Sequence, residues 1–275
     1  MSQSFQQKVI VITGASSGIG KALAEKALAE GAFVAACARN LEKLQATFAT
    51  VPDANRLMLY KADVSVKEDC QQFVSAVLAK WQRIDWLINN AGISMRALFE
   101  DVDLSVIESL MQVNFWGTVY MTKFALPAIK AQKGGIVGIS SIAGYRGLPG
   151  RAGYSASKFA MQGFLETLRT ELLYTGVQVM WAAPGFTSSN IRNTALAADG
   201  GAQKETPLDE SKLMSAETCA QIIFEGMRKR KRTIVMTTQG KATVWMNKLF
   251  PGWMDKMVFN HFAKEADSPV KKPSR

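Results

Sequence analysis

The feature that most constrains the fold of this chain is a regular alternation of short apolar runs with longer helical stretches. The apolar runs, which we expect to be strands, lie at 8–13, 33–38, 57–63, a stretch ending near 89, 135–140, 177–182 and 233–237. The helical stretches, often rich in Ala, Leu, Glu and Lys, lie at 18–30, 41–49, 67–80, 104–131, 154–174 and 215–229. Strictly alternating strands and helices form parallel sheets with helices on both faces. The sequence therefore predicts a single, doubly wound α/β domain with a mostly parallel, seven-stranded sheet.

A glycine-rich turn follows the first predicted strand. Gly14, Gly18 and Gly20 stand in the string TGASSGIG, and a predicted helix begins at Gly18. Glycines allow a tight turn and a close approach of the backbone to a pyrophosphate, whose charge is attracted by free N–H groups at the helix start. Glycine turns are common, but this position between a strand and a helix predicts a dinucleotide site.

Residues at the ends of the second and third predicted strands indicate which cofactor binds and what contacts it. An acid at the end of the second strand would bind a ribose 2′-hydroxyl, whereas this chain has Arg39 there. A guanidinium can bind a 2′-phosphate through two parallel hydrogen bonds, so we expect NADP(H). The alternative is a solvent-exposed arginine at a strand end. Asp63 and Val64 end the third strand, where they either contact the adenine or leave Asp63 as an ordinary capping acid.

Three further residues can handle a proton. Tyr154 and Lys158 stand four residues apart in YSASK, so a helix places them on one face. A tyrosine hydroxyl has a pKa of about 10, and a nearby cation lowers it by favouring the phenolate. Such a pair is common on helices, but Ser141 at a strand end adds a hydrogen-bond partner for a reacting oxygen. Together they predict an acid/base site for carbonyl or alcohol chemistry.

These motifs, taken in order, make the chain resemble the short-chain dehydrogenase/reductase family over roughly residues 8 to 240, with a Rossmann-like fold. The matching markers are TGASSGIG at 13–20, Asp63-Val64, NNAG at 89–92, Asn114 in VNFWG, Ser141, YSASK at 154–158 and Pro184-Gly185.

The resemblance implies a role for each matching residue. Tyr154 would be the general acid/base, and Lys158 would lower its pKa and hold the nicotinamide ribose. Ser141 would orient the substrate oxygen, and Asn114 would support a water relay. The cofactor site would comprise Gly14, Ser16, Ser17, Gly18, Ile19, Gly20, Arg39, Asp63, Val64, Asn90, Ala91, Gly92, Tyr154, Lys158, Pro184, Gly185, Thr187 and Ser189.

The chain departs from the family pattern after Pro184-Gly185, where Phe186 is followed by Thr187, Ser188 and Ser189. Which of these three hydroxyls contacts the carboxamide stays open. We expect the substrate pocket to be lined by 186–214 and 95–99, whose apolar residues indicate a partly hydrophobic carbonyl or alcohol. By resemblance, we also expect a homodimer or homotetramer.

Composition narrows the remaining function classes. The chain of 275 residues has three cysteines without a CxxC pair and a single histidine, His261. A serine-histidine hydrolase and a histidine-rich metal site are therefore poorly supported, and we expect no metal, buried reduced thiols and a cytoplasmic protein without a signal peptide. The net charge of +10 is compatible with scattered lysines and arginines, and no nucleic-acid motif accompanies it.

The last part of the chain is predicted to be separate from the dehydrogenase domain. We place the domain at 1–240 and an amphipathic extension with a charged tail at 241–275. The segment 241–264 is expected to cover apolar surface on the enzyme or on a twin subunit, with a break at Pro251-Gly252. Peripheral contact with an anionic membrane is the alternative. Two other functions stay open, namely a membrane-surface reductase of lipid-like or steroid-like compounds and a non-catalytic dinucleotide-binding protein.

Overall fold

Seven parallel strands form one sheet in the computed structural model, which describes residues 4–51, 53–185, 187, 191, 194–203, 213–264, 268 and 270. The strands are β1 (Val9–Thr13), β2 (Phe33–Ala38), β3 (Leu57–Lys61), β4 (Trp86–Asn89), β5 (Gly135–Ile139), β6 (Gln178–Ala183) and β7 (Thr233–Val235). Their order is β3-β2-β1-β4-β5-β6-β7, and every neighbouring pair is parallel. The predicted sheet is confirmed, and it is parallel throughout its described strands. The order reverses between β1 and β4, which is where open α/β sheets bind ligands.

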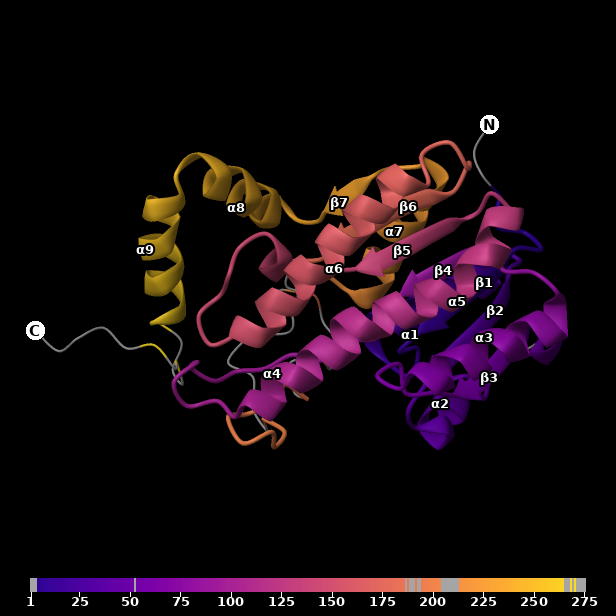
Figure 1. The fold of residues 1–275 in the computed structure, drawn as a ribbon, viewed down its shortest axis with the longest axis horizontal. Helices are drawn as coiled ribbons and strands as arrows, with labels where there is room; N and C mark the ends of the chain where they lie inside the picture. Colours follow the sequence, from indigo (N-terminus) through magenta and orange to yellow (C-terminus); the bar gives the residue numbers. More distant parts are fainter. Residues whose placement is uncertain are drawn as a thin grey trace, which may run out of the picture.

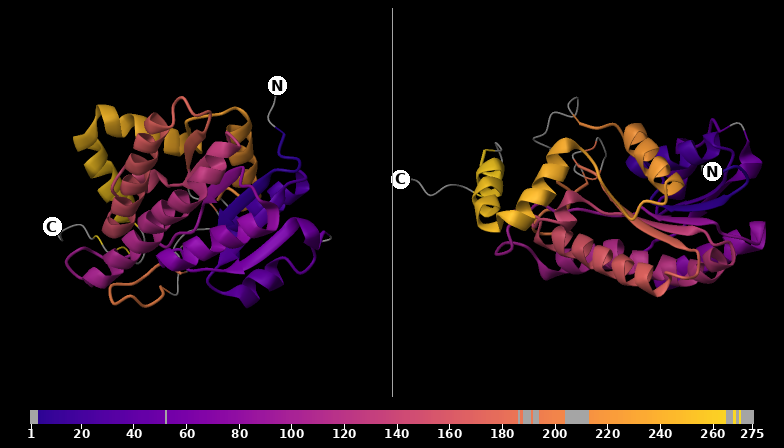
Figure 2. Two further views of the ribbon diagram at one scale, coloured as in Figure 1. Left: turned by 45° about the vertical axis from the view of Figure 1, so that its right-hand side comes forward. Right: turned by 90° about the horizontal axis from the view of Figure 1, so that it is seen from above.

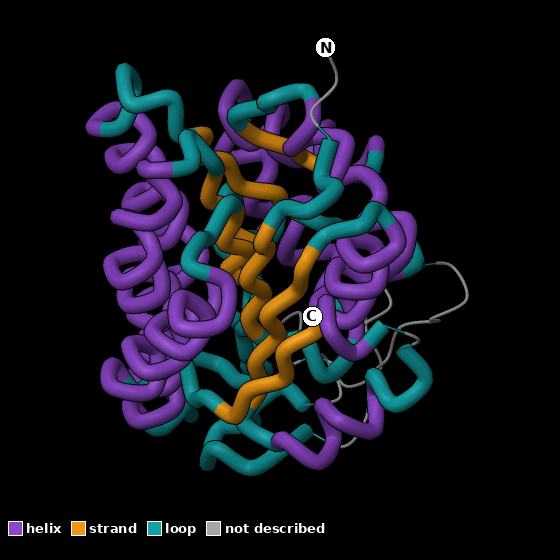
Figure 3. The backbone as a smooth tube through the Cα atoms, turned by 90° about the vertical axis from the view of Figure 1, so that its right-hand side faces the viewer, coloured by secondary structure: helices purple, strands orange, loops and turns teal. Residues whose placement is uncertain are grey.

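Helices cover both faces of this sheet (Figures 1, 2 and 3). One face carries α1 (Gly18–Ala29), α2 (Leu41–Thr47) and α7 (Ala216–Arg228), and the other carries α3 (Lys67–Trp81), α5 (Gly117–Ala131) and α6 (Ala152–Glu171). Short helices η1 (Ala54–Arg56) and η3 (Ile142–Gly144) and the helix α4 (Leu104–Leu110) complete this part. The predicted coverage of both faces is therefore confirmed.

Strand β1 shows why the apolar runs are continuous. Ile10 and Ile12 belong to the core under α1 and α7, whereas Val9 and Val11 belong to the core under α3, α5 and α6. Successive side chains of a strand point to opposite faces, so a strand between two helix layers is apolar at every position. Cys37, Cys70 and Cys219 are free and buried in these cores, as predicted.

The predicted long helical stretch from Leu104 to Ala131 is confirmed, but it is not α-helical throughout. α4 ends at Leu110, a π-helical segment η2 spans Met111–Trp116, and α5 begins at Gly117. A wider turn of this kind shifts the helical register and occurs often at functional sites. It contains Asn114, which is fully buried. Apolar periodicity carries no signal for such a turn.

The last two helices, α8 (Thr238–Leu249) and α9 (Pro251–Phe262), lie at the end of the molecule far from the N-terminus (Figure 1). The predicted break falls one residue earlier, at Phe250, and Pro251 opens α9, where its missing N–H costs no helical hydrogen bond. The predicted domain border at residue 240 lies inside α8. None of the helices within the described residues is long and apolar enough to cross a membrane.

Candidate active site

A cleft of about 780 Å³ runs along the carboxyl ends of the strands, across the point where strand order reverses. Most predicted site residues line it. These are Gly14, Ser16, Ser17, Gly18, Ile19, Gly20, Arg39, Asp63, Val64, Asn90, Ala91, Gly92, Ser141, Tyr154, Lys158, Pro184, Gly185 and Thr187. Asn114 is not among the lining residues, and Ser189 lies outside the described residues together with Phe186 and Ser188. The topology thus gathers segments from the whole sequence in one place.

The glycine-rich turn has no room for side chains at two positions. Gly14 has a φ of +66°, and a Cβ atom there would lie 2.7 Å from Cα of Ala91. A Cβ atom on Gly20 would lie 2.2 Å from the carbonyl oxygen of Gly14. Backbone packs against backbone here, which leaves the cleft side of the turn open to a close approach.

The start of α1 faces the same cleft with uncapped N–H groups. Ser17 is the N-cap residue, but its side chain makes no capping hydrogen bond, and the first turn contains no acid. Gly18, Ile19 and Gly20 line the cleft at this point. Free N–H groups and the positive end of the helix dipole form a site for an anionic group. The turn and the helix start therefore fit a pyrophosphate.

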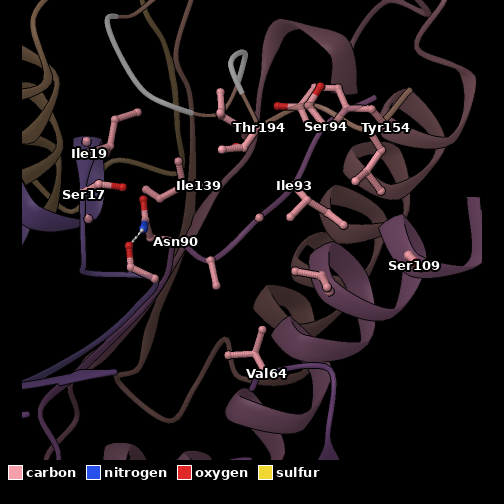
Figure 4. A pocket seen from close by; sticks show the side chains of 18 of the residues that line it. Ser17, Ile19, Val64, Asn90, Ile93, Ser94, Ser109, Ile139, Tyr154 and Thr194 are labelled. Atoms are coloured by element: carbon pink, nitrogen blue, oxygen red, sulfur yellow. Dashed lines mark hydrogen bonds between the residues drawn. The ribbon is translucent and has the colours of Figure 1, made fainter. Parts of the chain in front are cut away.

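The NNAG motif holds the glycine turn against the end of β4. The side-chain amide of Asn90 donates to the carbonyl oxygens of Thr13 and Gly14, at 2.9 and 3.1 Å. The hydroxyl oxygen of Thr13 accepts from the backbone N–H groups of Asn90 and Ala91, both at 3.0 Å. Figure 4 shows the Asn90 side chain within the pocket lining. Asn90 thus shapes the turn that the cofactor would contact.

The other end of the cleft carries two cations. Arg39 follows β2, as the sequence predicts, and Lys43 lines the same cleft from the first turn of α2. The sequence analysis missed Lys43, although it stands four residues after Arg39. Asp63 lines the cleft, and its carboxylate accepts from the N–H and the hydroxyl of Ser65, at 2.9 and 2.6 Å, as a capping acid does, whereas its contact with an adenine stays a prediction. This end is suited to a phosphate on an adenosine ribose.

Lys158 is held deep in the site. Its ammonium nitrogen donates to the carbonyl oxygen of Ile139 at 2.9 Å and lies 5.8 Å from the centre of the Tyr154 ring. Burial disfavours its charged form and lowers its pKa from 10.5 to about 8. The amine is thus fixed at the end of β5, next to Gly92, where an added Cβ atom would lie 3.4 Å from Nζ.

Tyr154 is buried beside Ser141, and several groups act on its hydroxyl. Burial raises the pKa of Tyr154, whereas a hydrogen bond with Ser141 and the charge of Arg151 lower it. The Ser141 hydroxyl also accepts from the N–H of Ala143 at 3.1 Å, which fixes it at the start of η3. The predicted effect of Lys158 on this pKa stays a prediction.

Arg151 is a site residue that the sequence analysis missed. It lines the cleft and donates to the hydroxyl of Ser94 at 2.9 Å. Ser94, Thr194 and Tyr154 lie together at one side of the pocket (Figure 4). The signal in the sequence is the distance of three residues between Arg151, which is the N-cap residue of α6, and Tyr154 in the first turn of that helix. The cation thereby stands close enough to favour the Tyr154 phenolate.

The side chain of Asn114 supports the site through hydrogen bonds to residues next to it. Its side chain accepts from the N–H of Ile93 at 2.8 Å and donates to the carbonyl oxygen of Ile93 at 3.0 Å and to the hydroxyl of Ser157 at 2.8 Å. It therefore ties the loop after β4 to α6, one residue before Lys158. Its expected part in a water relay stays a prediction.

The substrate end of the cleft is partly apolar, and one prediction about it is wrong. Leu148, Ile191 and Leu196 line it, whereas the predicted segment 95–99 does not. Met95 is fully buried in a core cluster and forms an isolated bridge with Leu196. Ile93 and Ser94 line the wall instead. Within the described part of 186–214, the lining residues are Thr187, Ile191, Thr194, Leu196 and Gly200.

The described residues contain no group of three or more His, Cys, Asp or Glu side chains that could hold a metal ion. Apart from the Asp63 carboxylate, the polar side chains that line the cleft are hydroxyls, amides and cations, which suit anionic groups and hydrogen-bonding oxygens.

Known proteins resemble this chain in sequence and in fold. The family model described as short chain dehydrogenase matches residues 8–200. An 11-beta-hydroxysteroid dehydrogenase-like protein 4A of Arabidopsis thaliana is 35% identical over 257 residues, covering 91% of this chain and 83% of the relative.

Two solved structures extend the likeness to the fold. A short-chain dehydrogenase from Streptomyces avermitilis has a TM-score of 0.80 at 26% identity, covering 95% of this chain and 99% of its own. A short chain dehydrogenase/reductase from Burkholderia phymatum, in complex with NAD, has a TM-score of 0.79 at 25% identity, covering 90% of this chain and 95% of its own.

Proposed function

This chain belongs to the short-chain dehydrogenase/reductase family of oxidoreductases, and on that basis we propose that it transfers hydride between NADP(H) and a carbonyl or secondary alcohol, with Tyr154 as general acid/base. The observation that carries the proposal is the group formed by the buried Tyr154 and Lys158 with Ser141 at one end of a cleft whose other end fits a dinucleotide. A hydride acceptor needs a proton donor within reach, and this group provides one.

The cofactor would lie along the cleft. Its nicotinamide supplies the hydride when bound. The turn at Gly14 and the start of α1 at Gly18 would hold the pyrophosphate, and Asp63 would contact the adenine. The Burkholderia phymatum protein holds NAD, so the preference for NADP(H) rests on this chain's own residues. Arg39 and Lys43 put two positive charges where a ribose 2′-phosphate would lie, and an acid at position 39 would repel it.

The side chains around Tyr154 have separate roles in the proton transfer. During reduction, the carbonyl carbon gains the hydride and its oxygen gains the Tyr154 proton, which gives an alcohol. Ser141 donates a hydrogen bond to that oxygen while charge develops on it. The positive charge of Arg151 stabilises the phenolate that is left. Lys158 would bind the nicotinamide ribose, and Asn114 would keep the adjoining loop in place.

The substrate class is supported by the apolar wall. Leu148, Ile191 and Leu196 favour a partly hydrophobic carbonyl compound, and several relatives carry the name 11-beta-hydroxysteroid dehydrogenase. We therefore propose lipid-like or steroid-like ketones as the first compounds to test. A non-catalytic binding protein is disfavoured because Tyr154, Lys158 and Ser141 are all present and all line the cleft. We also propose a homo-oligomer, supported by exposed Trp116 and Phe159 on neighbouring helices.

A substrate screen tests this function. The protein is mixed with NADPH or NADH and a panel of aldehydes, cyclic ketones and keto-steroids, and nicotinamide absorbance is followed. We expect turnover of at least one apolar ketone, with NADPH preferred over NADH. Tight NADPH binding without turnover across the panel would favour the binding protein instead, and equal rates with both cofactors would contradict the role of Arg39.

A further inference from the structure

The helical pair α8–α9 carries an exposed apolar surface, which we call the corner patch and define as Trp245, Leu249, Phe250, Trp253 and Met257. Trp245 is 61% exposed, Phe250 56% and Trp253 53%. Trp245 and Leu249 lie one turn apart on α8, and Trp253 and Met257 lie one turn apart on α9. Phe250 joins the two helices at the bend between them. The patch is therefore continuous around the corner.

The opposite side of the pair is fastened to the enzyme. Met254, Val258 and Phe262 are buried in a cluster with Leu148. The guanidinium of Arg146 donates to the side-chain oxygen of Asn247 at 2.9 Å and pairs with Asp255. The amide of Asn247 in turn donates to the carbonyl oxygen of Tyr145 at 3.1 Å. These packing and polar contacts hold the two helices in place on the enzyme, and they thereby fix the outward direction of the corner patch.

The charges around the patch have one sign. Lys241, Lys248 and Lys256 are exposed on the same two helices. Between 238 and 264 the sequence has one acid, Asp255, and its carboxylate is paired with Arg146. Exposed tryptophan and phenylalanine flanked by lysines are typical of helices that lie in the interface of an anionic bilayer.

We propose that the corner patch docks this protein onto an anionic phospholipid surface. The aromatic side chains would enter the boundary between headgroups and acyl chains, and the lysines would contact lipid phosphates. A second copy of the chain fits the patch less well, because a two-fold contact would bring identical lysines together on a protein whose net charge is already +10. Leu148 both packs under the patch and lines the cleft, so docking would bring the substrate wall near the lipid.

Vesicle sedimentation of the full chain tests the proposal. Vesicles of phosphatidylcholine with phosphatidylglycerol are compared with vesicles of phosphatidylcholine alone, at low and high salt. We expect binding to the anionic vesicles that high salt weakens, together with quenching of tryptophan fluorescence by brominated lipid. A lysine near an anionic surface contributes roughly fivefold in partitioning, so K241Q/K248Q/K256Q should lose on the order of a hundredfold. W245S/W253S should lose both sedimentation and quenching.

Matched variants at other exposed positions test whether vesicle binding depends on the patch or on any exposed aromatic residue or lysine. Tyr174 is 97% exposed at the end of α6, and Y174S should bind vesicles like the wild type. Lys229 and Lys231 are exposed between α7 and β7, before the amino end of β7, whereas α8 follows its carboxyl end, and K229Q/K231Q should lose less than the three lysine changes at the patch. All variants should keep the thermal unfolding midpoint of the wild type, because every changed side chain is exposed.

Two outcomes would overturn the proposal. One is equal sedimentation with anionic and neutral vesicles, or sedimentation that W245S/W253S leaves unchanged. The other is a wild type that stays free of vesicles while W245S/W253S converts an oligomer into monomers in a sizing experiment, which would assign the patch to a second copy.

Discussion

Replacing Lys158 with Met should make the protein more stable while removing its activity. The amine is 2% exposed and its pKa is lowered from 10.5 to about 8 by burial. The unfolded chain therefore holds more protons than the folded one between these two values, and the free energy of unfolding rises with pH across that window. At about 1.36 kcal/mol for each pH unit, the difference corresponds to roughly 3 kcal/mol of stability that the folded state lacks below pH 8.

Denaturant unfolding of the wild type and K158M from pH 7 to pH 10 measures this quantity. The methionine variant should be more stable at pH 7, by up to about 3 kcal/mol less the loss of the hydrogen bond to the Ile139 carbonyl, which contributes about 1 kcal/mol. Its advantage should shrink as pH rises from 8 towards 10, because the folded amine is then neutral and removing the proton from the unfolded amine costs less as pH approaches 10.5. K229M, at an exposed lysine, is the control and should show no such trend. A difference between wild type and K158M that is constant with pH would refute the reasoning.

Three other substitutions have defined outcomes. R39D should weaken NADPH binding by about ten- to hundredfold and favour NADH, as measured by fluorescence titration, because a charge-assisted hydrogen bond to the phosphate is lost; equal losses for both cofactors would contradict it. R151L should move the acidic limb of the pH profile for alcohol oxidation to higher pH, because oxidation needs the Tyr154 phenolate as base and removing the cation raises the pKa of Tyr154 further; an unchanged limb would exclude this role. N114A should lower the free energy of unfolding, measured by chemical denaturation, by about 1–3 kcal/mol for each backbone group of Ile93 left unpaired. A denaturation curve like that of the wild type would show that the loop after β4 does not depend on the Asn114 side chain.

The order of strands and helices could be predicted because the residue pattern of the sequence changes from one strand, helix or turn to the next. Residues 9–12 of the buried strand β1 are all apolar, and glycines stand in the following turn where a Cβ atom would collide with the backbone, as at Gly14 and Gly20. The site followed from the same logic, since parallel strands end at one edge of a sheet. Motif positions alone therefore placed Arg39, Tyr154 and Pro184 around one cleft.

Features set by side-chain packing could not be predicted in this way. The π-helical segment around Asn114 arises where a buried amide meets both backbone groups of Ile93, a contact between residues far apart in sequence. Met95 is buried in a core cluster instead of lining the cleft. Arg151 and Lys43 reach the cleft because of how their helices begin. Helical spacing suggests such positions only after the neighbouring site residue is known.

The general acid/base role of Tyr154 is the central claim, and Y154F tests it most directly. The change removes one hydroxyl and keeps the ring that packs in the site. With NADPH and the best ketone from the screen, kcat should fall by about 10²–10⁴-fold, while the Kd for NADPH stays within about twofold of the wild type. A variant that binds NADPH normally and keeps a kcat near the wild-type value would contradict the assignment of the proton donor.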